Sequence, residues 1–123
     1  MLSVLERGAW LGTAVRLVSP EWVRSQLEAE GRLTIVDVRG SVEFHGSPGH
    51  IPGARSIPAH QLSARSTELE RRPGKTVVLV SLSGSRARVV AATLLLAGVS
   101  PVCALDGGLR RWIDLGFPLE RSS

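Results

Sequence analysis

Apolar runs rich in β-branched residues recur along the chain and alternate with segments that carry helical signals. The runs at 33–38, 77–80 and 102–105 are nearly unbroken, which is typical of strands buried on both faces of a sheet. A very short run at 56–57 predicts one more strand. Because buried strands that alternate with helices form parallel sheets, the pattern predicts an α/β domain with helices on both faces of the sheet.

Helical signals occupy the segments between these strands. Ser19 and Pro20 give the strongest one, since serine caps a helix N-terminus and proline fits the first helical position. Residues 86–97 are apolar almost all round, so we expect their helix to be largely buried and to end at Gly98. The predicted helices cover residues 20–30, 41–44, 59–69, 86–97 and 109–115.

Length and composition indicate a single domain with a sizeable core. The chain has 123 residues and 43% of them are apolar, which argues against disorder. We expect an N-terminal extension (a helix or a tail) at 1–15, the domain at 16–120 and a short tail at 121–123. Glycine and proline predict a loop at 45–54 and a turn at 72–74.

The sequence lacks the features of a targeting or membrane segment. Its apolar N-terminus has no basic leading region and is soon interrupted by Glu6 and Arg7, which argues against a signal peptide and a membrane span. The single cysteine argues against an internal disulfide framework and a cysteine-based zinc cluster. We therefore expect a chain without metal or cofactor in the reducing cytoplasm.

Arginine dominates the charge of the chain. The formal net charge is +4, and Lys75 is the single lysine among 15 basic residues. These residues are scattered, and aromatic residues make up only 4% of the chain, which leaves no stacking platform for bases. The charge therefore argues against a nucleic-acid partner and favours a general attraction for small anions.

The candidate chemistry lies in the loop between the strand at 77–80 and the helix at 86–97. Small residues there allow backbone N–H groups, the helix N-terminus and one arginine to converge on one point, which predicts an anion-binding loop. Glycine within the loop lets the backbone turn without a Cβ clash. The predicted loop consists of Ser81, Leu82, Ser83, Gly84, Ser85 and Arg86.

A series of motifs in this order resembles the rhodanese-like (sulfurtransferase homology) domain. The matching pieces are Asp37-Val38-Arg39, Glu43-Phe44, Gly49-His50-Ile51-Pro52-Gly53-Ala54, Ile57-Pro58, Gly84-Ser85-Arg86, Leu105-Asp106-Gly107-Gly108 and Trp112. Their order and spacing agree from 17 to 118. The resemblance implies a single domain with a five-stranded parallel sheet, the active loop at the carboxyl ends of the strands, and supporting roles for Asp37, Arg39 and His50.

The chain departs from this family at the residue that carries the chemistry. Active members have a cysteine at the first loop position, which accepts a sulfane sulfur as a persulfide and passes it to a thiophilic acceptor. Here that residue is Ser81, although the six residues from it to Arg86 match the sulfurtransferase length; the related dual-specificity phosphatases have one residue more. A serine hydroxyl carries no persulfide and is not ionised without a positioned base. We expect an inactive domain that binds small oxyanions or a sulfur-carrier protein through 81–86.

Other interpretations stay open at this point. One is a thiosulfate or persulfide sulfurtransferase whose cysteine was exchanged for Ser81 by design, and another is a regulatory protein-interaction module. A hydrolase triad of Ser81, His50 and Asp37 is disfavoured, because an aspartate at a strand end and a loop histidine commonly bond to neighbouring groups. Cys103 lies in a buried strand, so we expect a core residue and not a substitute nucleophile. The oligomeric state is not predicted.

Structural roles are expected for the remaining motif residues. Arg39 is expected to pair with Glu43 or to support the loop from below. Gly107 and Gly108 are expected to permit a tight turn from a strand into the last helix, and Trp112 is expected to pack in the core against that turn.

Overall fold

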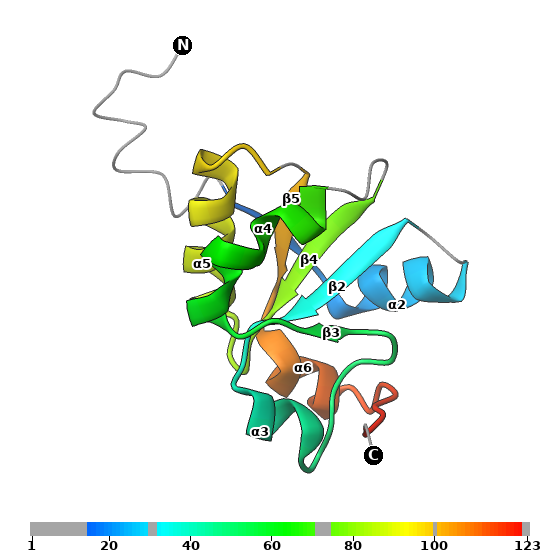
Figure 1. The fold of residues 1–123 in the computed structure, drawn as a ribbon. Coiled ribbons are helices and arrows are strands. Elements are labelled where there is room, and N and C mark those ends of the chain that lie inside the picture. The colour runs from blue at the N-terminus through cyan, green and yellow to red at the C-terminus, as the bar shows by residue number, and fades with distance from the viewer. Residues whose placement is uncertain (1–14, 30–31, 71–74, 100, 122–123) are drawn as a thin grey trace.

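A single parallel sheet organises the chain. The computed structural model describes residues 15–29, 32–70, 75–99 and 101–121, and its five strands lie in the order β1-β5-β4-β2-β3 (Figure 1). All neighbouring strands are parallel. The strands are β1 (Arg16–Val18), β2 (Leu33–Asp37), β3 (Arg55–Ser56), β4 (Thr76–Val80) and β5 (Val102–Leu105). The predicted five-stranded parallel α/β sheet is confirmed.

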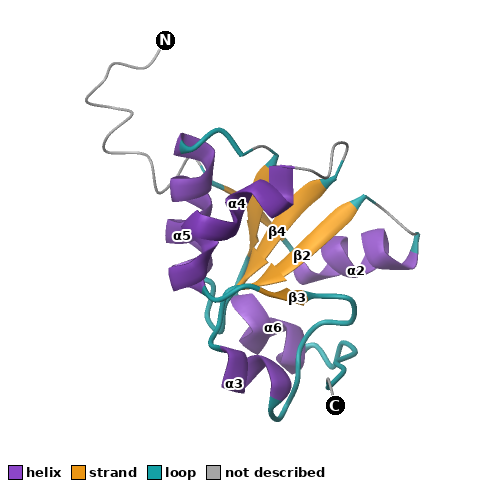
Figure 2. Cartoon of the chain, viewed as in Figure 1, coloured by secondary structure: helices purple, strands orange, loops and turns teal. Residues whose placement is uncertain are grey.

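Helices cover both faces of this sheet, as Figure 2 shows. They are α2 (Pro20–Glu28), α3 (Ser41–His45), the 3-10 turn η1 (Ala59–Gln61), α4 (Leu62–Glu70), α5 (Ser85–Leu96) and α6 (Gly108–Asp114). Alternate residues of β4 enter two separate core clusters: Val77 and Leu79 face α4 and α5, whereas Val78 and Val80 face α2 and α6. The short helix α3 lies near the carboxyl ends of the strands (Figure 1).

Most predicted elements are found within one or two residues of their expected ends. The Ser19 side chain caps α2 by accepting a hydrogen bond from the N–H of Trp22 at 3.0 Å, as its position predicts. Strand β1 had no local signal, because Arg16 and Leu17 are exposed at the edge of the sheet and only Val18 is buried. The expected turn at 72–74 and residues 1–14 of the expected extension lie outside the described residues.

The expectation that the helix at 86–97 is largely buried is wrong. In α5 only Ala87, Ala91 and Leu94 are buried, whereas Val89 is 68% exposed and Leu96 is 70% exposed. The physical reason is that α5 contacts the sheet along one stripe of residues three and four positions apart, and no further layer covers its outer side. Gly98 follows the helix with a φ of +89°, as expected for its end.

Cys103 belongs to the core, as its place in an apolar strand predicts. It is 1% exposed, and its Sγ lies 3.6 Å from the carbonyl oxygen of Val77. Burial raises the pKa of the Cys103 thiol from 9.0 to about 11, which the charge of Arg16 offsets only in part. A thiol with so little thiolate at neutral pH does not act as a nucleophile.

The turn into α6 brings this helix against the loop that follows β4. The N–H groups of Leu109 and Arg110 donate to the carbonyl oxygens of Ser81 and Leu82, each at 2.9 Å. A Cβ at Gly108 would lie 2.5 Å from both of these carbonyl oxygens, and the residue has a φ of +63°. The expected tight glycine turn is confirmed, and it fixes the first half of the loop.

No helix in the described ranges is long and apolar enough to cross a membrane.

We predict that Gly108→Ala destabilises the domain more than Gly116→Ala does. Both residues have positive φ, but a Cβ at Gly116 would have no atom within 4 Å. Gly116→Ala should therefore cost only the left-handed backbone strain of about 1–2 kcal/mol. Gly108→Ala should cost about 1–3 kcal/mol more, because the carbonyl groups of Ser81 and Leu82 must move. Urea unfolding measures both losses, and equal losses would show that the close approach does not matter.

Candidate functional site

The predicted anion-binding loop lies at the carboxyl end of β4 and leads into the N-terminus of α5 (Figure 1). A pocket of about 380 Å³ opens beside it. The pocket is lined by Arg39, Glu43, Ser81, Leu82, Ser83, Ser85 and Arg86. The fold therefore gathers the loop, the end of β2 and helix α3 around one cavity, although they are distant in sequence.

Ser81 points into the loop that it begins. Its side chain is 3% exposed, and its Oγ accepts hydrogen bonds from the N–H groups of Gly84 and Ala87, both at 3.1 Å. A hydroxyl oxygen has two acceptor lone pairs and one O–H donor. Since two N–H groups use the lone pairs, the O–H is the group that Ser81 has left to offer to a ligand.

Other donors remain along the same loop. Gly84 has a φ of +98°, and this turn sends the chain into α5. The N–H of Ser85 faces Ser83 Oγ at the long distance of 3.5 Å. In the described part of the chain, the N–H groups of Leu82, Ser83 and Arg86 have no hydrogen-bond partner. These amides, the positive end of the α5 dipole and the exposed Arg86 side chain together favour a negative charge.

Arg39 is anchored below the pocket by a buried ion pair with Asp37. Its Nε donates to Asp37 Oδ1 at 2.9 Å and its Nη2 donates to Oδ2 at 2.8 Å, with both side chains at most 5% exposed. Its Nη2 also donates to the carbonyl oxygen of Gly49 at 2.9 Å. Arg39 was expected either to pair with Glu43 or to support the loop from below, and the structure does not show the pairing with Glu43. Arg39 instead ties the end of β2 to the loop that precedes His50.

His50 is held within its own loop. Its ring stacks on Phe44 with centroids 3.8 Å apart, and its Nδ1 lies 2.9 Å from the Phe44 carbonyl oxygen. Its Nε2 lies 3.5 Å from Glu120 Oε1, and its backbone exchanges two hydrogen bonds with that residue. With His50 turned to Phe44 and Glu120, and Asp37 paired with Arg39, the disfavoured triad with Ser81 does not assemble.

Glu43 is the pocket residue that was not predicted as part of the site. It lies on α3, and its Oε1 accepts a hydrogen bond from the N–H of Gly40 at 3.3 Å. In the sequence, Glu43 is marked only by its motif between Arg39 and His50. That motif does not show that α3 lies beside the loop. In the described residues, neither Glu43 nor Arg86 forms an ion pair.

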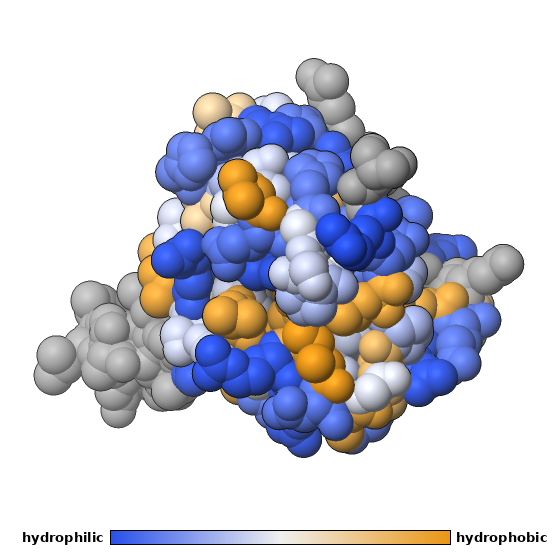
Figure 3. Space-filling view, turned by 90° about the horizontal axis from the view of Figure 1, so that it is seen from below, coloured by the Kyte–Doolittle hydropathy of each residue, from blue (hydrophilic) through white to orange (hydrophobic). Residues whose placement is uncertain are grey.

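The face that carries the pocket also presents apolar side chains. Figure 3 views the molecule from the side on which α3 and α6 lie, and apolar residues gather there among hydrophilic ones. Val42 on α3 is 87% exposed, and Leu82 in the loop and Leu115 just after α6 are each 41% exposed. Of these apolar side chains, Leu82 lines the pocket itself, together with the charged Arg39, Glu43 and Arg86.

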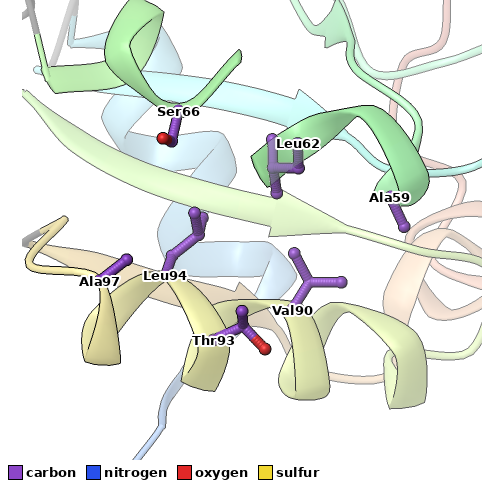
Figure 4. Close-up of a pocket in the computed structure, with 7 residues that line it drawn as sticks. All are labelled: Ala59, Leu62, Ser66, Val90, Thr93, Leu94 and Ala97. Carbon is purple, nitrogen blue, oxygen red and sulfur yellow. The ribbon is translucent and has the colours of Figure 1, made fainter. Parts of the chain in front are cut away.

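A second, smaller pocket of about 150 Å³ lies between α4 and α5. Figure 4 shows Leu62 facing Val90 and Leu94 across it. No titratable side chain is among the residues that line it, which are Ala59, Leu62, Ser66, Val90, Thr93, Leu94 and Ala97. Within the described ranges, no three His, Cys, Asp or Glu residues come together as metal ligands would. The loop pocket is therefore the stronger candidate site.

Known proteins share both the sequence and the fold of this chain. An uncharacterized protein of Synechocystis sp. is 37% identical over 97 residues, which are 79% of this chain and 52% of that protein. The thiosulfate sulfurtransferase YnjE of Escherichia coli is 35% identical over 129 aligned positions, which cover 88% of this chain and 30% of that protein. The chain thus spans about half, or less, of the length of these relatives.

The fold comparison agrees with the sequence comparison. The crystal structure of a thiosulfate sulfurtransferase from Pseudomonas aeruginosa superposes with a TM-score of 0.82 and 29% identity, over 93% of this chain and 22% of that one. The family model for the rhodanese-like domain matches residues 19–115, from the cap of α2 to the end of α6. The parallel sheet, the loop after β4 and these matches together show that the chain belongs to the rhodanese-like domain family.

Proposed function

We propose that this domain binds small oxyanions in the pocket beside loop 81–86 and does not itself transfer sulfur. The observation that carries the proposal is the geometry of Ser81, whose buried Oγ accepts two backbone N–H groups of its own loop. The pocket has donors for a negative charge, and none of the described residues that line it carries sulfur. The chain's single cysteine, Cys103, is buried in the sheet.

Ser81 is assigned to the position at which sulfurtransferases of this family carry their cysteine. Its place directly after β4 and the six residues from Ser81 to Arg86 support this assignment. In such an enzyme a cysteine thiolate attacks the outer sulfur of thiosulfate, the S–S bond of thiosulfate breaks, and sulfite leaves. The new S–S bond then holds the sulfur as a persulfide. An oxygen at this position cannot form that bond, so the transfer cannot begin.

Ser81 is also poorly placed to act as an oxygen nucleophile. Attack requires a free lone pair and a base that removes the proton. Both lone pairs of Ser81 Oγ accept hydrogen bonds from Gly84 and Ala87. The ring nitrogens of His50 face Phe44 and Glu120, and no hydrogen bond joins Glu43 to Ser81 in the described residues. Binding is therefore better supported than hydrolysis.

An oxyanion would meet several donors at once in this pocket. The O–H of Ser81, the amides of Leu82, Ser83 and Arg86, and the Arg86 guanidinium all belong to residues of the same loop. Charged acceptors strengthen such hydrogen bonds, and a guanidinium can contact two oxygens of one anion. A tetrahedral oxyanion such as sulfate or thiosulfate satisfies these donors better than chloride does.

A protein ligand is the second candidate. A sulfur-carrier protein that presents an anionic group, or a regulatory partner, would contact the same face, and the exposed side chains of Val42 and Leu82 favour such a contact. We infer that the domain spans 16–120 and works in the reducing cytoplasm, where a chain whose single cysteine is buried needs no disulfide.

We attribute the loss of sulfur transfer to one atom, Ser81 Oγ. The substitution Ser81→Cys tests this attribution. We expect no thiosulfate:cyanide sulfurtransferase activity from the chain above a control without protein. In Ser81→Cys, two N–H groups aimed at the side-chain atom should stabilise a thiolate, and thiosulfate should then add the mass of one sulfur atom. Mass spectrometry of the intact chain measures this gain.

Cys103→Ala supplies the control for this experiment. Activity of the unchanged chain that survives Cys103→Ala would contradict the proposal outright. A Ser81→Cys chain that gains no sulfur would show that more of the loop than residue 81 has changed. A gain is also what we expect for the alternative, a sulfurtransferase whose cysteine was exchanged by design.

We predict that Arg86→Ala weakens sulfate binding about tenfold, which corresponds to about 1.4 kcal/mol for a charge-assisted contact. Arg32→Ala is the matched control, because Arg32 is also exposed but precedes β2 at the opposite end of the strands. The rise of the thermal midpoint with sulfate, at constant ionic strength, reports the affinity of each variant. Equal weakening by both substitutions would mean that sulfate responds to net charge and not to this pocket.

A further inference from the structure

The loop pocket contains two opposite charges that form no ion pair with any described residue. Arg39, Glu43 and Arg86 are the charged residues that line it, and the charge of Arg39 is matched by the buried carboxylate of Asp37. Within the described part of the chain, Arg86 and Glu43 have no such match. The pocket therefore has a positive pole at the loop and a negative pole at α3.

The negative pole works against a bare inorganic anion. An unpaired carboxylate in the same cavity repels any anion bound at the loop, and it repels a doubly charged one more strongly than a singly charged one. Solvent screens part of this repulsion, because the Glu43 side chain is exposed, but the sign of the effect is unchanged. A pocket built only for sulfate or thiosulfate would gain affinity from a neutral residue at position 43.

The size of the pocket also favours a small organic ligand over a bare inorganic anion. Its volume of about 380 Å³ lies within the range of about 300–1,000 Å³ that is usual for small organic ligands. An inorganic oxyanion is only a few times larger than a water molecule, so the pocket has room for a longer ligand. Leu82 adds an apolar side chain to the lining, which suits a short carbon chain.

We propose that the pocket selects organic zwitterions, in which an anionic head bound at loop 81–86 is joined by a short carbon chain to an ammonium group that Glu43 binds. This inference rests on the proposed anion site and adds a selectivity to it. Glu43 acts as a specificity-determining residue: its carboxylate attracts the ammonium group and disfavours anions that lack one. The Oε1 atom keeps its hydrogen bond to the N–H of Gly40 while Oε2 is the oxygen left for the ligand.

Pairs of sulfonates that differ only in the ammonium group test this selectivity. Taurine is compared with ethanesulfonate, and homotaurine with propanesulfonate, by titration of the loop amide signals in NMR spectra of the full chain. We expect at least one of the aminosulfonates to bind about two- to fivefold more tightly than its partner, the size of an exposed ion pair. Glu43→Gln should abolish the preference and tighten the binding of the plain sulfonates.

Neither substitution used in this test is expected to disturb the fold. Glu43→Gln keeps a side-chain oxygen for the N–H of Gly40, and Glu28→Gln, an exposed residue at the end of α2, is the matched control that should leave the preference unchanged. Equal affinities within both pairs, with sulfate still binding through Arg86, would overturn the zwitterion inference alone. Failure of sulfate and of every sulfonate to shift the loop amides would overturn the anion site as well.

Discussion

Two backbone N–H groups directed at one side-chain oxygen determine what this site can do. The amides of Gly84 and Ala87 converge on Ser81 Oγ at 3.1 Å, inside a loop whose first residue is almost fully buried. Donors in this arrangement stabilise negative charge on whatever atom takes the position of Oγ. With sulfur there, they would favour a reactive thiolate. With oxygen there, they occupy the lone pairs and leave a hydroxyl that donates.

The rest of the fold holds this loop in place from two sides. Helix α6 donates two backbone N–H groups to the loop carbonyls, an approach that only a glycine at 108 permits. The buried pair of Asp37 and Arg39 holds the end of β2 and, through the carbonyl of Gly49, the segment that leads to His50. His50 stabilises the position of this segment by stacking its ring on Phe44. The residues that flank the pocket therefore maintain its shape, while Glu43 and every loop residue except Gly84 line it.

The sequence predicted the elements better than the contacts between them. Buried strands and the Ser19 cap are local signals, and each was found close to its expected place. Strand β1 was missed because two of its three residues are exposed at an edge. The exposure of Val89 on α5 was missed because an apolar composition does not reveal that the helix has only one packed side.

Within the site, the loop was predicted from its small residues and its position after a strand. The role of Glu43 was not, because its carboxylate reaches the pocket only through the packing of α3 beside the loop. The direction of the Ser81 side chain was equally hidden, since a serine-rich turn in sequence does not say which amides its hydroxyls accept. The sequence therefore predicted the position of the anion-binding loop. The presence of both Glu43 and Arg86 in one pocket became visible only in the structure.

The site proposed for this domain requires that the Ser81 hydroxyl keep the hydrogen bonds from its two loop amides and donate a hydrogen bond to a bound anion. A crystal structure of the chain grown in sulfate tests it most directly. We expect a sulfate oxygen within hydrogen-bond distance of Ser81 Oγ, with the N–H groups of Gly84 and Ala87 still directed at that Oγ. A loop in which these two amides have left Ser81, or a pocket in which sulfate makes no contact with residues 81–86, would contradict it.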